Sequence, residues 1–83
     1  MYYLILCKSL TYAQRAARVL EQSGISARPV QVPQNISNKG CGYSVRVQER
    51  RVYDALRVLD SSGFKRGRVF FQSSNGELQE VDI

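Results

Sequence analysis

The sequence predicts an α+β fold, a two-layer sandwich of helices packed on an antiparallel sheet, and three observations lead to this prediction. Residues 17–30 and 56–69 align without gaps at an offset of 39 positions. Each copy contains the end of an amphipathic helix, a glycine suited to the left-handed cap, and then an extended segment. Short apolar segments of strand character flank each helix. The sequence therefore repeats one helix-and-strand unit.

Four segments are predicted strands: Tyr2–Lys8, Ala27–Pro33, Tyr43–Gln48 and Arg68–Ser73. In the third of them, every second side chain is apolar and the alternating ones are polar, which predicts a half-exposed strand. Pro29 and Pro33 remove backbone donors from the second segment, so we expect that strand at an edge of the sheet.

Two segments are predicted helices. The first runs from about Thr11 to Ser23, with its buried stripe formed by Ala13, Ala16, Ala17 and Leu20. Thr11 and Gln14 have the spacing of a capping box, which predicts Thr11 as the N-cap. The second helix runs from about Arg50 to Ser62, and its inner face is Val52, Ala55, Leu56 and Leu59.

The C-terminal end of the sequence predicts a hairpin. Asn75-Gly76 is a strong signal for a two-residue turn, after which Glu77–Ile83 returns beside the fourth strand. Phe70 and Phe71 must point to opposite faces of the sheet, so one of them requires the extra strand or a partner to cover it.

The predicted element order is β-α-β-β-α-β with one more strand. Two βαβ halves with right-handed crossovers interleave into a ferredoxin-like sandwich with sheet order 4-1-3-2, here extended by the C-terminal hairpin strand. We expect one domain over residues 1–83, with the duplication covering roughly residues 1–33 and 42–73 and the hairpin residues 68–83.

Composition excludes several classes of function. The 83 residues contain no histidine and two cysteines, and the net charge is +5. Without histidine or paired carboxylates we predict no enzyme, and without a C-x-x-C spacing we predict no metal and no cofactor. No apolar run is long enough for a membrane span, and no signal-peptide pattern is present, so we expect a cytoplasmic protein.

The chemistry-bearing residue is Cys41, which stands between Gly40 and Gly42 just before the third strand. Strands one and three are adjacent and antiparallel in the predicted sheet, so Cys41 should lie near Cys7 at the end of strand one. Cys7 is either a small core residue or a resolving thiol that forms a disulfide with Cys41. Cys41 is itself either a packing residue or an exposed, reactive thiol.

Positive charge near Cys41 favours the reactive interpretation. The first turn of the first helix, near Thr11, should emerge at the same end of the sheet, and a helix N-terminus carries partial positive charge. Lys8 and Lys39 flank the site and also favour the thiolate. The flanking glycines allow a sulfur species or a partner protein to approach the backbone closely.

Several motifs of the N-terminal half resemble the selenium/sulfur carrier-like family. They are the helix start Ser9–Ala13, Gly24-Ile25 after the helix, the segment from Val32-Pro33 to Ile36-Ser37, and Cys41-Gly42. The resemblance covers roughly the first 48 residues well and the second helix loosely. Gln34 stands where that family usually has arginine, and three residues separate Ser37 from Cys41.

The resemblance implies a carrier rather than a catalyst. Cys41 would accept a terminal sulfur or selenium as a persulfide or perselenide, from a cysteine desulfurase or another donor, and pass it to an acceptor protein. Such chemistry requires a thiolate and open access but no general base. The residues that we expect to bind substrate or partner around Cys41 are Gly40, Gly42, Lys39, Lys8, Ser37 and Thr11.

Two alternatives stay open. Residues 39–47 resemble the first signature of the RNA-recognition motif, but Cys41 occupies an aromatic position and Tyr43 is the one stacking residue that fits, so nucleic acid is the weaker interpretation. The other alternative is a homodimerising interaction module that uses Val69, Phe70 and Phe71 as an apolar patch.

Overall fold

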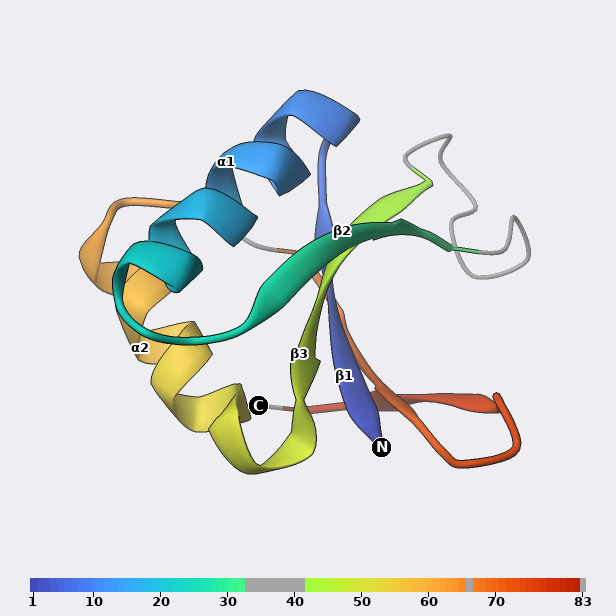
Figure 1. The fold of residues 1–83 in the computed structure, drawn as a ribbon. Coiled ribbons are helices and arrows are strands. Elements are labelled where there is room, and N and C mark those ends of the chain that lie inside the picture. Colours follow the sequence, from blue (N-terminus) through green and yellow to red (C-terminus); the bar gives the residue numbers. More distant parts are fainter. Residues whose placement is uncertain (33–41, 66, 83) are drawn as a thin grey trace.

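The computed structural model describes residues 1–32, 42–65 and 67–82 of the chain. Its elements are β1 (Tyr2–Cys7), α1 (Leu10–Gln22), β2 (Ala27–Gln31), β3 (Tyr43–Gln48), a 3-10 turn η1 (Glu49–Arg51), α2 (Val52–Ser61), β4 (Val69–Gln72) and β5 (Leu78–Val81). Two helices and a five-stranded sheet confirm the predicted α+β class (Figure 1).

Every strand pair in the sheet is antiparallel, and the order is β2-β3-β1-β4-β5. β1 and β3 are adjacent in the sheet, as predicted, and all six residues of β1 are in register with β3, from Tyr2 opposite Gln48 to Cys7 opposite Tyr43. β2 lies at an edge, as Pro29 predicted, because a proline there removes a donor from the ladder.

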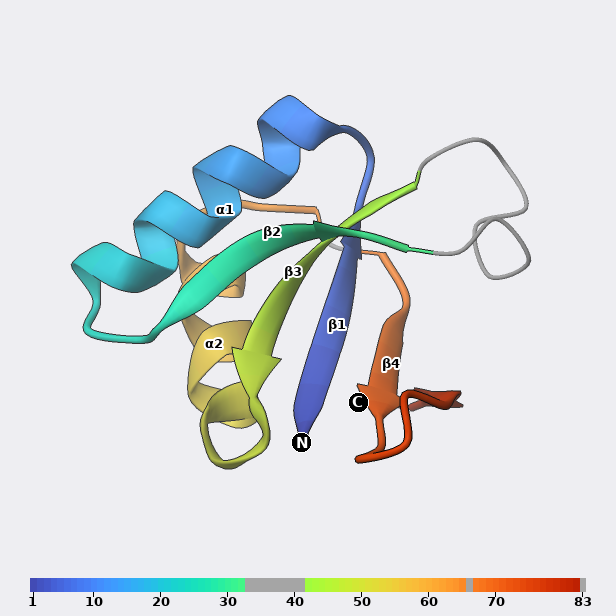
Figure 2. The ribbon, with the colours of Figure 1, turned by 45° about the vertical axis from the view of Figure 1, so that its right-hand side comes forward.

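Both helices cover the same face of the sheet (Figures 1 and 2). Their buried residues are those that the helical periodicity predicted: Ala13, Ala16, Ala17 and Leu20 on α1, and Val52, Ala55, Leu56 and Leu59 on α2. These side chains form one cluster with Ile5, Val45 and Val47 of the central strands. Small residues on α1 let the helix approach the sheet closely.

The two helices end in the same way. Gly24 and Gly63 have φ values of 82° and 79°, in the left-handed region. Ile25 donates its N–H to the carbonyl of Leu20 at 2.9 Å, and Phe64 makes the equivalent 3.0 Å bond to Leu59. These bonds satisfy carbonyls that the last turn would leave unpaired, which is the Schellman arrangement.

The second helix begins later than predicted. The sequence predicts a start near Arg50, but Glu49–Arg51 form a 3-10 turn, and the α-helix starts at Val52 without a side-chain cap. The tight turn reverses the chain directly after β3, and a 3-10 turn at a helix N-terminus is common.

The C-terminal hairpin has a longer loop than predicted. Gly76 donates to the carbonyl of Ser73 at 3.0 Å, and Ser73 donates to the carbonyl of Glu77 at 3.0 Å. The loop is therefore Ser74–Gly76, three residues rather than two, with Gly76 at a φ of 88°. This is a turn followed by a left-handed glycine, the second common way to close a hairpin.

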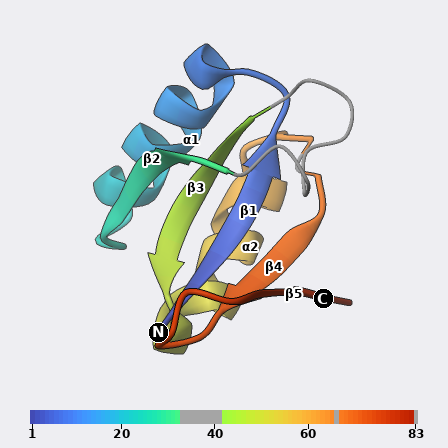
Figure 3. The same cartoon turned by 90° about the vertical axis from the view of Figure 1, so that its right-hand side faces the viewer.

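A second apolar cluster lies on the face of the sheet without helices. Leu4, Val32 and Phe70 are buried there, and the half-buried Leu6, Val30 and Leu78 pack against them. β5 runs nearly across the direction of β1 (Figures 1 and 3), and through Leu78 it contributes to this cluster. The extra strand thus helps to cover Phe70, one of the two alternatives that the sequence offered.

Two predictions about which side chains are exposed are wrong. Ser44, expected on the exposed side of β3, has no exposed surface, and its hydroxyl donates to the carbonyl of Val30 at 3.4 Å. Val69 and Phe70 are 2% and 3% exposed, so the segment does not present the expected apolar patch. Both outcomes arise because each face of the sheet carries a buried cluster, with Val69 on the helix side and Phe70 on the other.

An ion pair joins the residue before β4 to the edge strand β5. Arg68 donates to both carboxylate oxygens of Glu80, at 3.1 and 2.9 Å, and its guanidinium lies over the ring of Phe70. The hydrogen bond from Arg68 lowers the pKa of the Glu80 carboxyl below its ordinary value, and the same bond raises the pKa of Arg68. The pair is exposed, so its contribution is screened by solvent.

Candidate functional site

The candidate site lies at the end of the sheet where β1 ends, β3 begins and α1 starts. Cys7 is in register with Tyr43, and the chain from Cys7 enters α1 at Leu10. Val32 donates its N–H to the carbonyl of Gly42 at 2.7 Å, so the hydrogen bonding between the β2 and β3 segments continues to this end. This bond holds Gly42, the residue after Cys41, against the β2 segment, and the pairing of Tyr43 with Cys7 places it next to the end of β1.

Half of the predicted site residues can be located. Gly42, Cys7, Lys8 and Thr11 belong to this end of the molecule. Cys41, Lys39, Gly40 and Ser37 lie outside the described residues.

Cys7 occupies a packing position. Its side chain is 4% exposed and belongs to the cluster between the sheet and the helices. The Sγ atom lies 3.5 Å from the carbonyl oxygen of Ile5. A thiol so enclosed reacts slowly with solutes, because reactivity requires both access and the thiolate.

Thr11 is not the N-cap of the first helix. Ser9 takes this role, with an extended backbone and a side-chain oxygen that accepts the N–H of Tyr12 at 3.1 Å. Thr11 is exposed in the first turn of α1. The sequence carried a signal for this outcome, because Ser9 also precedes the periodic run and serine ranks above threonine as an N-cap.

An aromatic and cationic cluster, formed by Lys8, Tyr12, Phe64 and Lys65, joins the start of α1 to the loop after α2. The rings of Tyr12 and Phe64 meet edge to face with centroids 5.0 Å apart. The Tyr12 hydroxyl accepts the backbone N–H of Lys65 at 2.6 Å, and the Lys8 ammonium lies 4.9 Å from the centre of the Tyr12 ring. Sequence analysis missed this cluster because Tyr12 and Lys65 are 53 positions apart.

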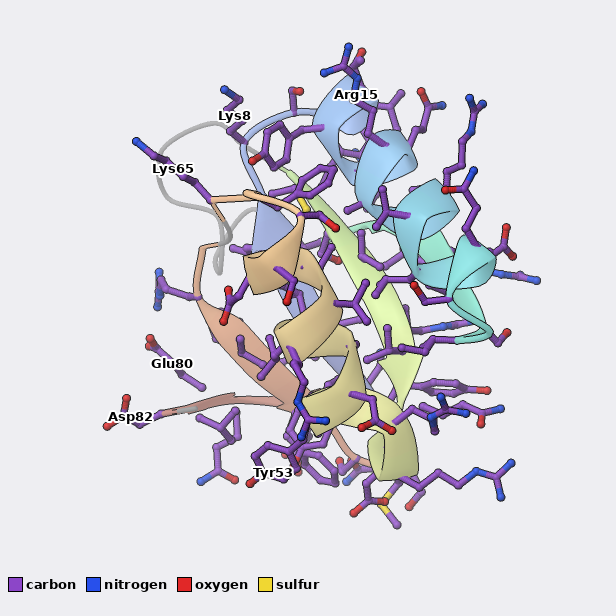
Figure 4. The ribbon with its side chains drawn as sticks, turned by 90° about the vertical axis from the view of Figure 1, so that its left-hand side faces the viewer. Lys8, Arg15, Tyr53, Lys65, Glu80 and Asp82 are labelled. Atoms are coloured by element: carbon purple, nitrogen blue, oxygen red, sulfur yellow. The ribbon has the colours of Figure 1, made fainter. Side chains whose placement is uncertain are left out.

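This end of the molecule is electropositive. Figure 4 shows Lys8, Lys65 and Arg15 at the same end, while Glu80 and Asp82 lie toward the other. The first turn of α1 contains no acidic residue, so no carboxylate there offsets the positive end of the helix dipole. A thiolate or another anion close to this end would be stabilised.

The surface required for RNA stacking is not present at the predicted place. Tyr43 packs against the cluster on the helix side of the sheet, so its ring is not on the face without helices. RNA-recognition motifs stack bases on aromatic rings of that open face. The one aromatic residue of the sequence match therefore does not supply a platform.

The described residues contain neither a metal-binding group of side chains nor a membrane-spanning helix. Among residues 1–32, 42–65 and 67–82, no three His, Cys, Asp or Glu side chains are close enough to hold a metal ion. Within the same ranges, no helix is long and apolar enough to cross a membrane.

Comparison with known proteins supplies the family. No curated protein and no solved structure matches the chain with significant similarity. The family described as "Putative Se/S carrier protein-like" matches residues 2–70, which include both cysteines, the two helices, the strands β1 to β3 and the first two residues of β4. With most of its length matched, the chain belongs to this family.

Proposed function

We propose that this protein is a sulfur or selenium carrier and that Cys41 is the residue that bears the cargo. The family match across Cys41 carries this proposal. The anchored Gly42 supports it, because it ties the chain next to Cys41 to the electropositive end of the sheet, where a thiolate is favoured.

The transfer is a thiol exchange. The Cys41 thiolate attacks the outer sulfur of a donor persulfide, the sulfur–sulfur bond of the donor breaks, and the donor leaves as a thiolate. Cys41 then carries a persulfide, and an acceptor thiolate removes the outer sulfur by the same reaction. No net oxidation occurs, and no general base is required. A perselenide is transferred in the same way.

The surrounding residues have subsidiary roles in this proposal. Lys8 and Lys39 favour the thiolate, Gly40 and Gly42 allow close approach of a partner, and Ser37 and Thr11 contact it. In this proposal the donor is a cysteine desulfurase or another protein persulfide, and the acceptor is a second protein. The proposed compartment is the cytoplasm. Cys7 resolves the persulfide only if the end of the sheet opens, since its thiol is buried.

The proposal includes the architecture. The strand pairs β2–β3, β3–β1 and β1–β4 correspond to the order 4-1-3-2 when it is counted from the opposite edge. This supports a single ferredoxin-like domain over residues 1–83, with β5 as its addition.

The test is loading by a persulfide donor. The purified protein should gain about 32 Da with sulfur, or about 80 Da with selenium, on the peptide that contains Cys41. The matched variants are Cys41→Ser and Cys7→Ser. We expect Cys41→Ser to fold and accept no sulfur and Cys7→Ser to be loaded like the parent.

Alkylation rates provide an independent measurement. Cys41 should react faster than Cys7 at pH 7. The plot of its alkylation rate against pH should have a midpoint below the ordinary thiol pKa of about 8.5. Lys8→Gln should raise this midpoint, whereas Arg18→Gln, which removes an exposed charge further along α1, should not. Loading of Cys41→Ser to the level of the parent would refute the carrier role.

A further inference from the structure

A corner of the sheet far from Gly42 contains two arginines side by side. Arg28 of β2 and Arg46 of β3 are register partners, so their Cβ atoms lie about 4.5 to 5.5 Å apart on one face. Arg46 is also in register with Leu4, which places both arginines on the face without helices. Like charges directly opposite each other destabilise a strand pair.

Within the described residues, no side-chain carboxylate forms an ion pair with either arginine. The side-chain ion pairs found in the described part of the chain, Arg51–Asp54 and Arg68–Glu80, involve neither arginine. Residues 33–41, Arg66 and Ile83, which lie outside that part, include no aspartate or glutamate. An external anion bound between these two side chains would offset their mutual repulsion.

Arg46 is held in position. Its guanidinium carbon lies 4.3 Å from the centre of the Tyr2 ring, and the residue is half-buried. A guanidinium over a ring face can still donate hydrogen bonds from its N–H groups. An arginine already restrained in this way loses less conformational freedom when it binds an oxyanion.

The two arginines line a small polar cavity. Its volume is about 120 Å³, and its walls are Tyr2, Ser26, Ala27, Arg28, Arg46 and Gln48. Since one water requires about 10 to 15 Å³ by this measure, the cavity has room for a group of phosphate size. The Ser26 hydroxyl and the Gln48 amide add neutral donors to the two guanidiniums.

We propose that this corner, formed by Tyr2, Ser26, Arg28, Arg46 and Gln48, is a binding site for a phosphate group. Paired guanidiniums match the planar, bidentate geometry of phosphate oxygens better than any other side chain does. The site is separate from the carrier proposal. Along β3, Arg46 lies three residues from Tyr43, roughly 10 Å, and Gln48 lies five residues from it, roughly 17 Å.

The phosphate can belong to a mononucleotide or to the backbone of single-stranded RNA, and one experiment separates these sources. The full chain, labelled with ¹⁵N, is titrated with AMP, with adenosine and with a hexauridylate. We expect AMP, but not adenosine, to shift the backbone amides of Ser26, Arg28 and Arg46. Stronger shifts of the same amides by the hexauridylate would assign the phosphate to RNA, and weaker ones to a mononucleotide.

Variants test the two arginines. Arg28→Gln/Arg46→Gln should weaken binding at least about tenfold, because each lost charged hydrogen bond is worth more than a neutral one. Arg46→Lys should give an intermediate loss, since lysine keeps the charge and loses the fork. The matched control is Arg18→Gln/Arg57→Gln, which removes two exposed helical charges and should change the affinity less than about twofold.

Three results would overturn the proposal. They are no shift with AMP or the hexauridylate at millimolar concentration, equal shifts with adenosine and AMP, and equal weakening by the control pair. Arg28 is exposed on an edge strand, so Arg28→Gln alone remains informative if the double variant unfolds. Circular dichroism of each variant reports whether it is folded.

Discussion

At the scale of single residues, Gly67 shows how closely the segment before β4 approaches β1. Its N–H donates to the carbonyl of Leu6 at 2.8 Å, and a Cβ atom built on Gly67 would lie 3.2 Å from that oxygen. We expect Gly67→Ala to lower the free energy of unfolding by about 1 to 2 kcal/mol, because the backbone that it would push is held in the ladder. Urea unfolding measures the change.

Gly42→Ala is the matched control for that substitution. A Cβ atom on Gly42 would lie 3.8 Å from the carbonyl oxygen of Val32, an ordinary contact. Loss of glycine freedom in the unfolded chain then stabilises the protein by about 0.4 to 1 kcal/mol. If Gly67→Ala proves as stable as Gly42→Ala, the close approach to Leu6 is not a constraint.

At the scale of elements, the start of α1 separates two candidate caps. Ser9→Ala should destabilise the protein by about 1 kcal/mol, because the N–H of Tyr12 loses the oxygen that accepts it at 3.1 Å. Thr11→Ala should change stability by less than about 0.5 kcal/mol, since Thr11 is exposed inside the helix. Both changes are measured by urea unfolding. A larger loss of stability in Thr11→Ala than in Ser9→Ala would show that Thr11 is the N-cap.

The same elements show what the sequence can predict. All eight buried residues of the two helical stripes follow from the period of the α-helix, because one face must pack on the sheet. The edge position of β2 follows from Pro29, which cannot donate. The predicted N-cap is wrong because Ser9 competes with Thr11 for that position. The predicted hairpin loop is wrong because Asn75-Gly76 fits a three-residue loop as well as a two-residue one.

The candidate site was predictable only in part. The antiparallel pairing of β1 and β3 brings Gly42 to the end of β1 by topology alone, and this was expected. The contacts of Tyr12 with Phe64 and Lys65 depend on how the loop after α2 returns over α1. Residues so far apart in the chain leave no local pattern, so no periodicity or turn signal could reveal them.

At the scale of the whole molecule, the sheet buries apolar side chains on both faces, although helices cover only one. Phe70 is 3% exposed on the face without helices, among Leu4, Val32 and Leu78. Phe71 points to the helix side, where it is half-buried and meets the ring of Tyr3 edge to face at 5.2 Å. Phe70, in the second cluster, is therefore more deeply buried than Phe71 on the helix side.

Substitution of each phenylalanine tests whether the second cluster is a true core. Phe70→Ala should cost about 3 to 5 kcal/mol, because it removes a large buried ring and leaves a cavity. Phe71→Ala should cost about 1 to 2 kcal/mol, since part of that ring is already in water. A chain of 83 residues has a total stability of about 4 to 12 kcal/mol, so Phe70→Ala should leave the fold marginal. Urea unfolding of the two variants measures both losses of stability. If Phe70→Ala destabilises the protein no more than Phe71→Ala does, the second cluster is a covered surface and contributes little to the stability of the fold.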